Sequence, residues 1–456
     1  MNPSTLQQDW FIEEKQKIEG NKKFKNQKRK RQYLHFDKRI SNLTLDGIKN
    51  VWNPTEVSRH SFYPFIRFVK KLKKYSKTKT KISFKPKERP IDFAAHYDAS
   101  IYSWYSFLLS LKYEDELKAR NLSDIPIAYR KIDHKSNLEF AADIISFIKK
   151  HPNYEVMTFD VEKFFENIDH IKLKQQWAKL LKMQSLPIDH YQVFKSLTNY
   201  HYAEMEQLHR RFEFTLKEHS EKQQVCSSDE FRTKVCQGGL LKKNSKVRKD
   251  GDKEYRVGIP QGSSISCLLA NLYMIDFDQE VSQLVSSLGG LYRRYSDDII
   301  VVIPKGAISD VEWGVVSASQ KVDLNLHKDK REKRHFITQS GRLICVDSES
   351  KKISTLQYLG IQFDGEDVYL RHAGIAKFQR RRSRTVKHTI TTLKKGRHVP
   401  MKMYLQKFTR HGKDNYLAYA DRAKAVFPSP KMKKQLSPNR VAKQLKKRIK
   451  KFNEDK

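Results

Sequence analysis

Residues 292–303 read Tyr-Arg-Arg-Tyr-Ser-Asp-Asp-Ile-Ile-Val-Val-Ile and place two adjacent carboxylates, Asp297 and Asp298, between runs of β-forming residues. This pattern predicts a hairpin over 291–303 that turns around Ser296-Asp297. Adjacent acids repel each other and lose hydration beside apolar residues, so the pair costs stability unless a cation compensates it. We expect that cation to be a divalent metal. The alternative is a surface turn that carries an accidental acidic pair.

The composition indicates a folded protein with a polyanionic partner. The chain has 456 residues, enough for about three domains or lobes. Its 90 Lys and Arg against 52 Asp and Glu give a net charge of +38, and aromatic residues make up 11%. A charge excess of this size indicates binding to nucleic acid or to a membrane surface, and the aromatic content favours nucleic acid bound by a folded domain.

Membrane insertion and disulfide formation are not expected. No run of about 18 apolar residues occurs, and acidic residues precede the first apolar run. Four cysteines without any C-x-x-C spacing lack the usual zinc pattern and favour reduced thiols, although Cys226 and Cys236 remain an alternative pair. We therefore expect a soluble protein of the cytoplasm.

Hydrophobic periodicity predicts an alternation of helices and short strands. Two basic clusters, within 22–31 and 70–81, precede these elements, and they are interpreted either as nucleic-acid contacts with interleaved aromatics or as solvated helical faces. Helices are expected at 97–118, 140–149, within 170–220, at 265–277, at 311–326 and after 371. Strands or hairpins are expected at 127–131, 156–161, within 226–256, at 291–303 and in two short strands over 356–370.

Two acids that are far apart in the sequence, Asp160 and Asp297, both lie at the ends of predicted strands, where they could bind metal ions together. Asp160 lies near the end of the predicted strand 156–161, and Asp297 lies in the predicted hairpin turn. Phosphoryl transfer from a nucleoside triphosphate uses two cations held by hard oxygen ligands from different elements. Each acid alone is weak evidence for such a site.

The segment after Asp160, Asp-Val-Glu-Lys-Phe-Phe-Glu-Asn-Ile-Asp-His, resembles the first metal-binding motif of reverse transcriptases. Those enzymes carry an aromatic residue five positions after the acid, and here it is Phe165. The resemblance implies that this ring lies under the incoming sugar and leaves no room for a 2′-hydroxyl. It therefore implies deoxynucleotide substrates.

Two further segments match the same family in the same order. Gly258-Ile259-Pro260-Gln261-Gly262-Ser263-Ser264 resembles its Pro-Gln-Gly motif, and Tyr295-Ser296-Asp297-Asp298 resembles its Tyr-x-Asp-Asp hairpin. The resemblance implies that Asp160 and Asp297 bind two Mg²⁺ ions, with Mn²⁺ as a substitute, and that Asp298 is a weaker ligand. It adds the carbonyl of Val161 as a ligand and assigns Gln261 and Gly262 to nucleotide binding.

Less specific matches to the same family extend the resemblance over roughly 97–370. Arg130 and Lys131 stand where cations of the family's fingers clamp the triphosphate, and Lys330 resembles the lysine after the last palm helix. Tyr358-Leu359-Gly360 resembles the turn that holds the primer. The implied fold is α+β, a right-hand polymerase with a ferredoxin-like palm and mostly helical fingers and thumb. The expected regions are a basic extension (1–90), fingers and palm (91–370) and a basic helical thumb (371–456).

The implied activity is RNA-directed DNA synthesis from dNTPs, with an RNA template and a DNA product. No ribonuclease H or HNH pattern is found, which indicates a polymerase with basic flanks only. The Ala-Tyr-Arg-Lys stretch at 128–131, the helix expected from Tyr97 and the long insertion before Pro260 resemble bacterial stand-alone reverse transcriptases of the defence-associated, abortive-infection type. These imply a noncoding RNA or a companion defence protein as further partners and allow an oligomer. A retron or group II intron-like enzyme remains an alternative, as does a catalytically silent nucleic-acid-binding scaffold.

Overall fold

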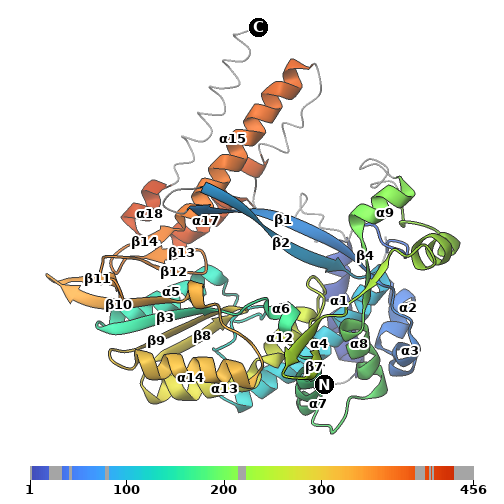
Figure 1. The fold of residues 1–456 in the computed structure, drawn as a ribbon, viewed down its shortest axis with the longest axis horizontal. Helices are drawn as coiled ribbons and strands as arrows, with labels where there is room; N and C mark the ends of the chain where they lie inside the picture. Colours follow the sequence, from blue (N-terminus) through green and yellow to red (C-terminus); the bar gives the residue numbers. More distant parts are fainter. Residues whose placement is uncertain are drawn as a thin grey trace. The chain divides into compact units, whose positions relative to one another are not determined.

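The computed structural model describes residues 3–19, 33–40, 44–77, 82–213, 222–395, 406–409, 412 and 415–435. Within these residues the protein is a mixed α/β structure with several sheets (Figure 1). The chain forms two compact units, each built from separate segments. The first unit comprises Met1–Tyr129, Val161–Val281 and Val315–Leu326, and the second comprises Arg130–Asp160, Ser282–Gly314 and His327–Lys456.

A five-stranded antiparallel sheet forms the centre of the second unit, in the order β11-β10-β3-β9-β8. Four of its strands, β10-β3-β9-β8, have the order 4-1-3-2 when numbered along the chain. The strands are β3 (Tyr154–Asp160), β8 (Leu291–Tyr295), β9 (Asp298–Pro304), β10 (Glu332–Gln339) and β11 (Arg342–Asp347). The strand order places the end of β3 beside the start of β9.

The position of β9 between β3 and β8, inside the sheet, explains its uninterrupted apolar sequence. Ile299 to Ile303 are all at most 1% exposed, so both faces of the strand are covered. Strands buried on both faces have continuous hydrophobic runs, whereas strands with one exposed face alternate. The run that follows Asp298 is therefore the middle of a core.

Helices α13 (Ile275–Ser287) and α14 (Ile308–Lys321) flank the hairpin of β8 and β9 in the chain, and Figure 1 labels all four elements. The two helices approach each other closely at Gly314, where an added Cβ would lie 2.3 Å from the side chain of Leu284. A glycine inside a helix costs roughly 1 kcal/mol relative to alanine. Here it permits the two helices to pack.

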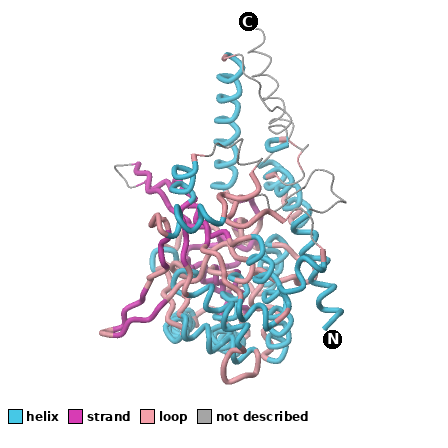
Figure 2. The backbone as a smooth tube through the Cα atoms, turned by 90° about the vertical axis from the view of Figure 1, so that its right-hand side faces the viewer, coloured by secondary structure: helices cyan, strands magenta, loops and turns pink. Residues whose placement is uncertain are grey.

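A second layer of the same unit contains α5 and a three-stranded sheet, β12-β13-β14. Their apolar residues share one core cluster with β3, β9 and the C-terminal helices. A capping box of Ser136 and Glu139 begins α5. The elements are α5 (Asn137–Lys150), the 3₁₀ helix η3 (Lys328–Lys330), β12 (Leu356–Tyr358), β13 (Ile361–Phe363), β14 (Val368–Leu370), α15 (His372–Lys394), α17 (Tyr416–Val426) and α18 (Pro430–Gln435). Figure 2 shows α15 as one uninterrupted helix.

The first unit joins a four-stranded sheet, β2-β1-β4-β5, to a set of helices. Its strands are β1 (Phe65–Lys77), β2 (Ile82–Phe93), β4 (His201–Glu204) and β5 (Leu241–Lys243), with a separate hairpin of β6 (Val247–Asp250) and β7 (Lys253–Arg256). Its helices are α1 (Pro3–Glu19), α2 (Leu45–Ile48), η1 (Lys49–Trp52), α3 (Pro54–Arg59), α4 (His96–Ala119), α6 (Phe164–Asn167), α7 (His170–Leu180), α8 (Ile188–Thr198), α9 (Met205–Phe212), α11 (Ser228–Glu230), the π-helix η2 (Phe231–Cys236) and α12 (Ser266–Tyr273).

Most of the predicted elements are confirmed, and three need correction. The strand predicted at 127–131 is wrong, because Tyr129 has a φ of +63° and the segment forms bends. The helix predicted at 265–277 is interrupted after Tyr273, which separates α12 from α13. Three strands, not two, occupy 356–370, because the chain also turns at Leu359-Gly360.

Other sequence-based expectations have different outcomes. In the described part of the chain, no helix is long and apolar enough to cross a membrane. All four cysteines are free thiols, so Cys226 and Cys236 are not paired. The basic cluster within 22–31 lies outside the described residues. The division into regions at 90 and 370 remains a prediction, and its first boundary falls inside β2.

Candidate active site

The turn between β8 and β9 presents the acidic pair at the edge of the five-stranded sheet. Ser296 and Asp297 form the turn, and Ser296 adopts a φ of +60°. A left-handed conformation is unusual for a residue with a side chain. Arg294, which is fully buried, donates a hydrogen bond of 3.2 Å from Nη1 to the carbonyl of Ser296. This buried guanidinium therefore stabilises the turn.

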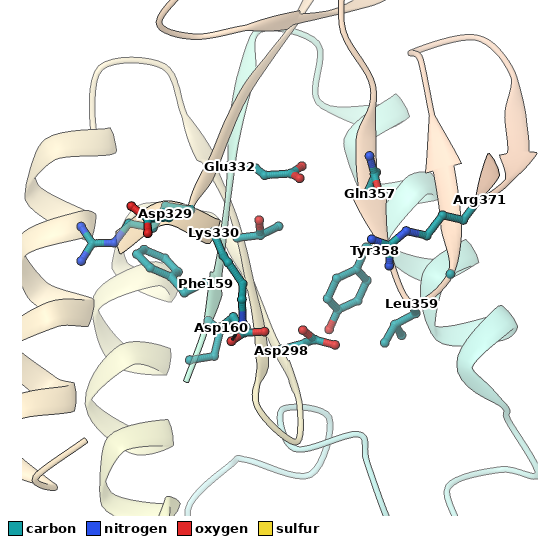
Figure 3. Close-up of a pocket in the computed structure, with 14 residues that line it drawn as sticks. Phe159, Asp160, Asp298, Asp329, Lys330, Glu332, Gln357, Tyr358, Leu359 and Arg371 are labelled. Atoms are coloured by element: carbon teal, nitrogen blue, oxygen red, sulfur yellow. Dashed lines mark hydrogen bonds and ion pairs between the residues drawn. The ribbon is translucent and has the colours of Figure 1, made fainter. Parts of the chain in front are cut away.

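Asp160 and Asp298 are brought together by strand register. Asp160 is the last residue of β3, Asp298 is the first of β9, and the two are directly paired across the antiparallel ladder. Directly opposite residues have Cβ atoms about 5 Å apart and point to the same face. Figure 3 shows both carboxylates facing the same space. The structure thus joins two acids that are far apart in the sequence.

The electrostatics of Asp298 show an excess of negative charge. Its pKa is raised to about 6, first because the surrounding protein removes water from the carboxylate and then because Asp297 and Asp160 repel its charge. Lys330 and Arg371 offset only part of this effect. Like charges held this closely favour the binding of a cation.

A lysine already supplies one positive charge to Asp160. Lys330, at the end of η3, forms an ion pair and a hydrogen bond with Oδ1 of Asp160. The segment before η3 is attached to the end of β3, because the backbone N–H of His327 donates to the carbonyl of Asp160 at 2.8 Å. The His327 ring nitrogen Nε2 lies 3.6 Å from the same carboxylate oxygen. Figure 3 shows the Lys330 side chain reaching toward Asp160.

These acids line a pocket of about 380 Å³ whose other wall is the turn between β12 and β13. Leu359 and Gly360 of that turn have φ values of +46° and +87°. The amide of Asn137 donates to the carbonyl of Leu359 at 3.0 Å, and the N–H of Arg371 donates to the carbonyl of Gly360 at 3.1 Å. The lining residues are Thr158, Phe159, Asp160, Asp298, Ile299, Asp329, Lys330, Arg331, Glu332, Gln357, Tyr358, Leu359, Gly360 and Arg371.

Tyr358 projects from this wall into the pocket, opposite Asp298 (Figure 3). The residue is only 8% exposed, and burial, followed by the charge of Asp298, raises its pKa. Within the described residues its hydroxyl has no hydrogen-bond partner. Buried polar groups are nearly always hydrogen-bonded, so this hydroxyl is an exception that calls for a cause.

The three carboxylates are of the chemical type that binds a divalent metal, although the structure does not bring them together around one point. Asp160, Asp297 and Asp298 are hard oxygen ligands of the kind that Mg²⁺ and Mn²⁺ prefer. Asp297 and Asp160 both contribute to the raised pKa of Asp298, after burial, and their negative charges favour a cation at this place. In the part of the chain that the structure describes, no group of three or more His, Cys, Asp or Glu side chains converges closely enough to hold an ion. Asp297 is absent from the pocket lining, whereas Lys330 pairs with Asp160.

The other two sequence motifs meet in the first unit. The N–H of Ile259 donates to the carbonyl of Phe165 at 3.0 Å, and the N–H of Gly258 donates to that of Ile168 at 2.9 Å. Gly258 has a φ of +94°, and an added Cβ would lie 3.1 Å from the carbonyl oxygen of Glu166. The segment after Asp160 and the Pro-Gln-Gly segment are thus bonded backbone to backbone.

Gly262 is required by the close approach of β2. Its φ is +127°, and an added Cβ would lie 2.8 Å from the carbonyl oxygen of Asp92. The N–H of Asp92 donates to the carbonyl of Gln261 at 2.8 Å. The Asp92 carboxylate in turn accepts two hydrogen bonds from Arg67, at 2.7 and 2.9 Å. Sequence analysis did not find Asp92 or Arg67, because neither lies in a recognisable motif.

Several predicted site residues lie elsewhere or remain untested. Arg130 lies in a bend, Lys131 follows it in a loop, and neither residue lines the pocket. Val161 bridges to Leu326, and its role as a carbonyl ligand remains a prediction. The ranking of Asp297 above Asp298 also remains a prediction. Among the lining residues, sequence analysis missed Arg371, Glu332 and Gln357; Arg371 directly precedes the cationic helix α15, which was the only available signal.

Comparisons with known proteins give only distant similarity. No protein-family model and no curated protein matches the chain. Telomerase from Candida albicans in complex with a telomeric RNA fragment aligns with 70% of this chain and 47% of its own, at 14% identity and a TM-score of 0.37. Apo telomerase from Candida tropicalis, truncated from its C-terminal domain, aligns with 71% of this chain and 59% of its own, at 12% identity and a TM-score of 0.38. The chain spans about half the length of these telomerases, and similarity this distant assigns neither a fold nor a function.

Proposed function

We propose that the protein is an RNA-directed DNA polymerase with a ferredoxin-like palm. The observation that carries the proposal is the register of Asp160 with Asp298 at one edge of a sheet whose strands have the order 4-1-3-2. This order is that of a ferredoxin-like β-α-β-β-α-β unit. The acids come from the two motifs that resemble those of reverse transcriptases, and the Pro-Gln-Gly motif lies between them in the sequence.

In this proposal Asp160, Asp297 and Asp298 hold two Mg²⁺ ions. When bound, the metals lower the pKa of the attacking hydroxyl and neutralise the departing phosphates. The side chains orient these ions from the rigid ends of β3 and β9, which keeps the ligands in place. Lys330 leaves Asp160 and neutralises phosphate charge, and Tyr358-Leu359-Gly360 contact the primer strand.

The test is nucleotide incorporation by the purified protein. With Mg²⁺, dNTPs and a primed RNA template, wild type is expected to extend the primer, and Asp297→Asn is expected not to. Equal extension by both would overturn the metal site. Template binding without extension by wild type would favour the silent scaffold instead.

Sugar selection is a separate prediction that concerns Phe165. The Phe165→Ala variant is expected to lower discrimination against ribonucleotides by roughly 10-fold or more, because a larger pocket admits the 2′-hydroxyl. Phe164→Ala is the matched control, since its ring is buried beside Phe165 at a centroid distance of 5.6 Å. The measurement is the ratio of kcat/KM for dNTP and rNTP, and a loss of discrimination in both variants would indicate general damage.

The biological role is proposed from sequence resemblance alone. A stand-alone enzyme of the defence-associated type would act in the cytoplasm on a cellular or companion RNA. Retron and group II intron-like enzymes are the alternatives within the same chemistry. Sequencing the nucleic acid that copurifies with the protein from cells would distinguish them, since a retron enzyme is expected to retain one dedicated noncoding RNA.

A further inference from the structure

Exposed apolar side chains are grouped in the first unit, in the turn that leads into α8 and in the first turn of that helix. Met183, Ile188 and Tyr191 are all exposed, and Ile188 is 76% exposed. Ile188 and Tyr191 are three positions apart on α8 and therefore lie on the same face of the helix. Single exposed apolar residues are ordinary on a protein surface, whereas a group of them marks an interaction site. We call these three residues the α8 patch.

The opposite side of α8 is packed into the first unit. Its apolar residues are buried, namely Val193, Phe194 and Leu197. The hydroxyl of Tyr105 donates to the Asp189 carboxylate at 2.6 Å. Nε1 of Trp177, on α7, donates to Nδ1 of His190 at 3.2 Å. These contacts fix the start of the helix, so the α8 patch is presented on a rigid support.

The exposed charges around the α8 patch are positive. Among residues 171–198 every exposed charged residue is a lysine, and these are Lys174, Lys179, Lys182 and Lys195. Nζ of Lys174 lies 4.8 Å from the centroid of the Tyr191 ring, and Lys195 follows Tyr191 by one helical turn. Lys179 forms an ion pair with Asp276 at 3.7 Å. We call the other three the patch lysines. Charge complementarity therefore requires a ligand that is both apolar and acidic.

The chemistry of the α8 patch favours a protein segment over nucleic acid. Unpaired bases bind proteins by stacking on open aromatic rings. The Tyr191 ring is already engaged, because Lys174 lies over it and Phe194 stacks beside it at a centroid distance of 6.3 Å. The other two members of the patch are not aromatic, and they gain most from burial against apolar side chains. A second copy of the chain would place the patch lysines against each other, and like charges repel.

We propose that the α8 patch binds an amphipathic segment of another protein. Apolar side chains of that segment contact the patch, and acidic side chains beside them pair with the patch lysines. An apolar centre with a charged rim is the usual arrangement of a protein interface. None of these residues lines the pocket that contains Asp160 and Asp298. The inference goes beyond the proposed polymerase function and does not depend on it.

Two synthetic peptides of equal negative charge test this surface. One combines leucine and glutamate so that the leucines form one helical face, and in the other serine replaces every leucine. Fluorescence anisotropy with labelled peptides measures binding to the full-length protein. Wild type is expected to bind the leucine peptide roughly 10-fold more tightly than the serine peptide, because only the leucine peptide buries apolar area on the patch.

Ile188→Ser is expected to bind the two peptides with similar affinity. Ile353→Ser is the matched control, because Ile353 is 80% exposed but lies in the second unit, and it is expected to keep the wild-type ratio. Neither substitution is expected to change unfolding in urea, since both side chains are exposed. Equal binding of the two peptides by wild type would overturn the inference. The same follows if Ile188→Ser keeps the wild-type ratio, or if Ile353→Ser loses it as well.

The charges are tested separately. Lys195→Glu is expected to weaken binding of the leucine peptide roughly 2- to 5-fold at low salt, and this effect is expected to shrink as salt is added. Lys118→Glu, at an exposed lysine of α4, is the control and is expected to have a smaller effect. Equal effects of the two variants would show that only the overall charge attracts the peptide, which contradicts a defined surface.

A labelled single-stranded RNA tests the competing ligand. It is expected to bind wild type and Ile188→Ser equally, because the proposed surface recognises protein. Weaker RNA binding in Ile188→Ser, together with unchanged peptide binding, would assign the α8 patch to nucleic acid and overturn the inference.

Discussion

Asp92 at the end of β2 is buried, whereas Asp298 at the start of β9 is an exposed residue, and the charges around the two carboxylates also differ. Asp92 is 2% exposed and accepts two hydrogen bonds from Arg67, whose guanidinium lies 3.5 Å from the centroid of the Tyr202 ring. Burial alone would lower the pKa of Arg67. The hydrogen bond and the negative charge of Asp92 outweigh this effect, so the pKa of Arg67 is raised. Asp298 instead has two acidic neighbours. Burial raises the pKa of Asp92 as well, because Arg67 offsets only part of the lost hydration. The two acids therefore differ in the charge of their nearest neighbours, which is positive at Asp92 and mainly negative at Asp298.

The largest expected effect comes from Asp160. Asp160→Asn removes a proposed metal ligand and is expected to lower primer extension about 1,000-fold, since metal binding contributes several kcal/mol of transition-state stabilisation. The unfolding free energy is expected to stay unchanged or rise, because one of three like charges is gone. Single-turnover extension and urea denaturation measure the two quantities. Asp143→Asn, at an exposed acid of α5, is the control and should change neither.

The opposite pattern is expected for Arg67. Arg67→Met leaves the buried Asp92 without its partner, and we expect a loss of about 3 kcal/mol in unfolding free energy. Lys70→Met, at an exposed cation of the same strand, is expected to cost little. Urea denaturation of both variants tests this difference. If Arg67→Met were as stable as Lys70→Met, Asp92 would not depend on its ion pair, and the comparison with Asp298 would fail.

The raised pKa of Asp298 predicts a specific dependence of stability on pH. Burial and the charges of Asp297 and Asp160 place this pKa at about 6 in the folded protein, above its ordinary value of 3.8. The folded state then binds more protons than the unfolded state between these values, so stability falls as pH rises from about 4 to about 6. After allowance for solvent screening, we expect a loss of about 1 kcal/mol.

Denaturation in EDTA at several pH values, for wild type and Asp298→Asn, isolates this contribution. The variant lacks the titrating group, so its stability relative to wild type is expected to increase from pH 4 to pH 6 and to remain constant above. Parallel curves would show that Asp298 titrates normally and that its neighbours do not repel it.

The smallest expected effect concerns Lys330. Its ammonium group pairs with Asp160 and, in the proposed function, would compete with a metal for that carboxylate. Lys330→Gln is therefore expected to bind Mn²⁺ roughly 2- to 5-fold more tightly in the absence of nucleotide. The electron paramagnetic resonance signal of free Mn²⁺ measures this affinity. Lys328→Gln, at an exposed lysine of the same turn, is the control. Unchanged or weaker binding in Lys330→Gln would show that the ion pair does not oppose the metal.

Local sequence patterns predicted the elements that carry the acids. The hairpin of β8 and β9, the strand β3 and helices α4 and α5 follow from periodicity and turn residues. The hairpin of β1 and β2 was missed, because its lysines and aromatics were interpreted as a nucleic-acid-binding cluster. Propensity also failed at Ile127–Lys131, where Tyr129 adopts a positive φ that apolar composition does not reveal.

The residues of the site could be predicted only in part, because a single sequence does not reveal which residues of two distant strands pair with each other. Asp160 and Asp297 were found from motifs, but the direct pairing of Asp160 with Asp298 depends on how β3 and β9 align. The position of Tyr358 opposite these acids depends on a separate sheet, β12-β13-β14. Arg371 and Glu332 carry no motif, and their place in the pocket is a tertiary property.

The central position of β3 also affects how the protein folds during synthesis. Its two partners, β9 and β10, begin about 140 and 170 residues further along the chain. At roughly 5 to 20 residues per second, β3 leaves the ribosome several seconds before either partner exists. An apolar strand without partners is exposed to aggregation during that interval. We therefore expect expression at low temperature, or with added chaperones, to increase the soluble yield of this protein.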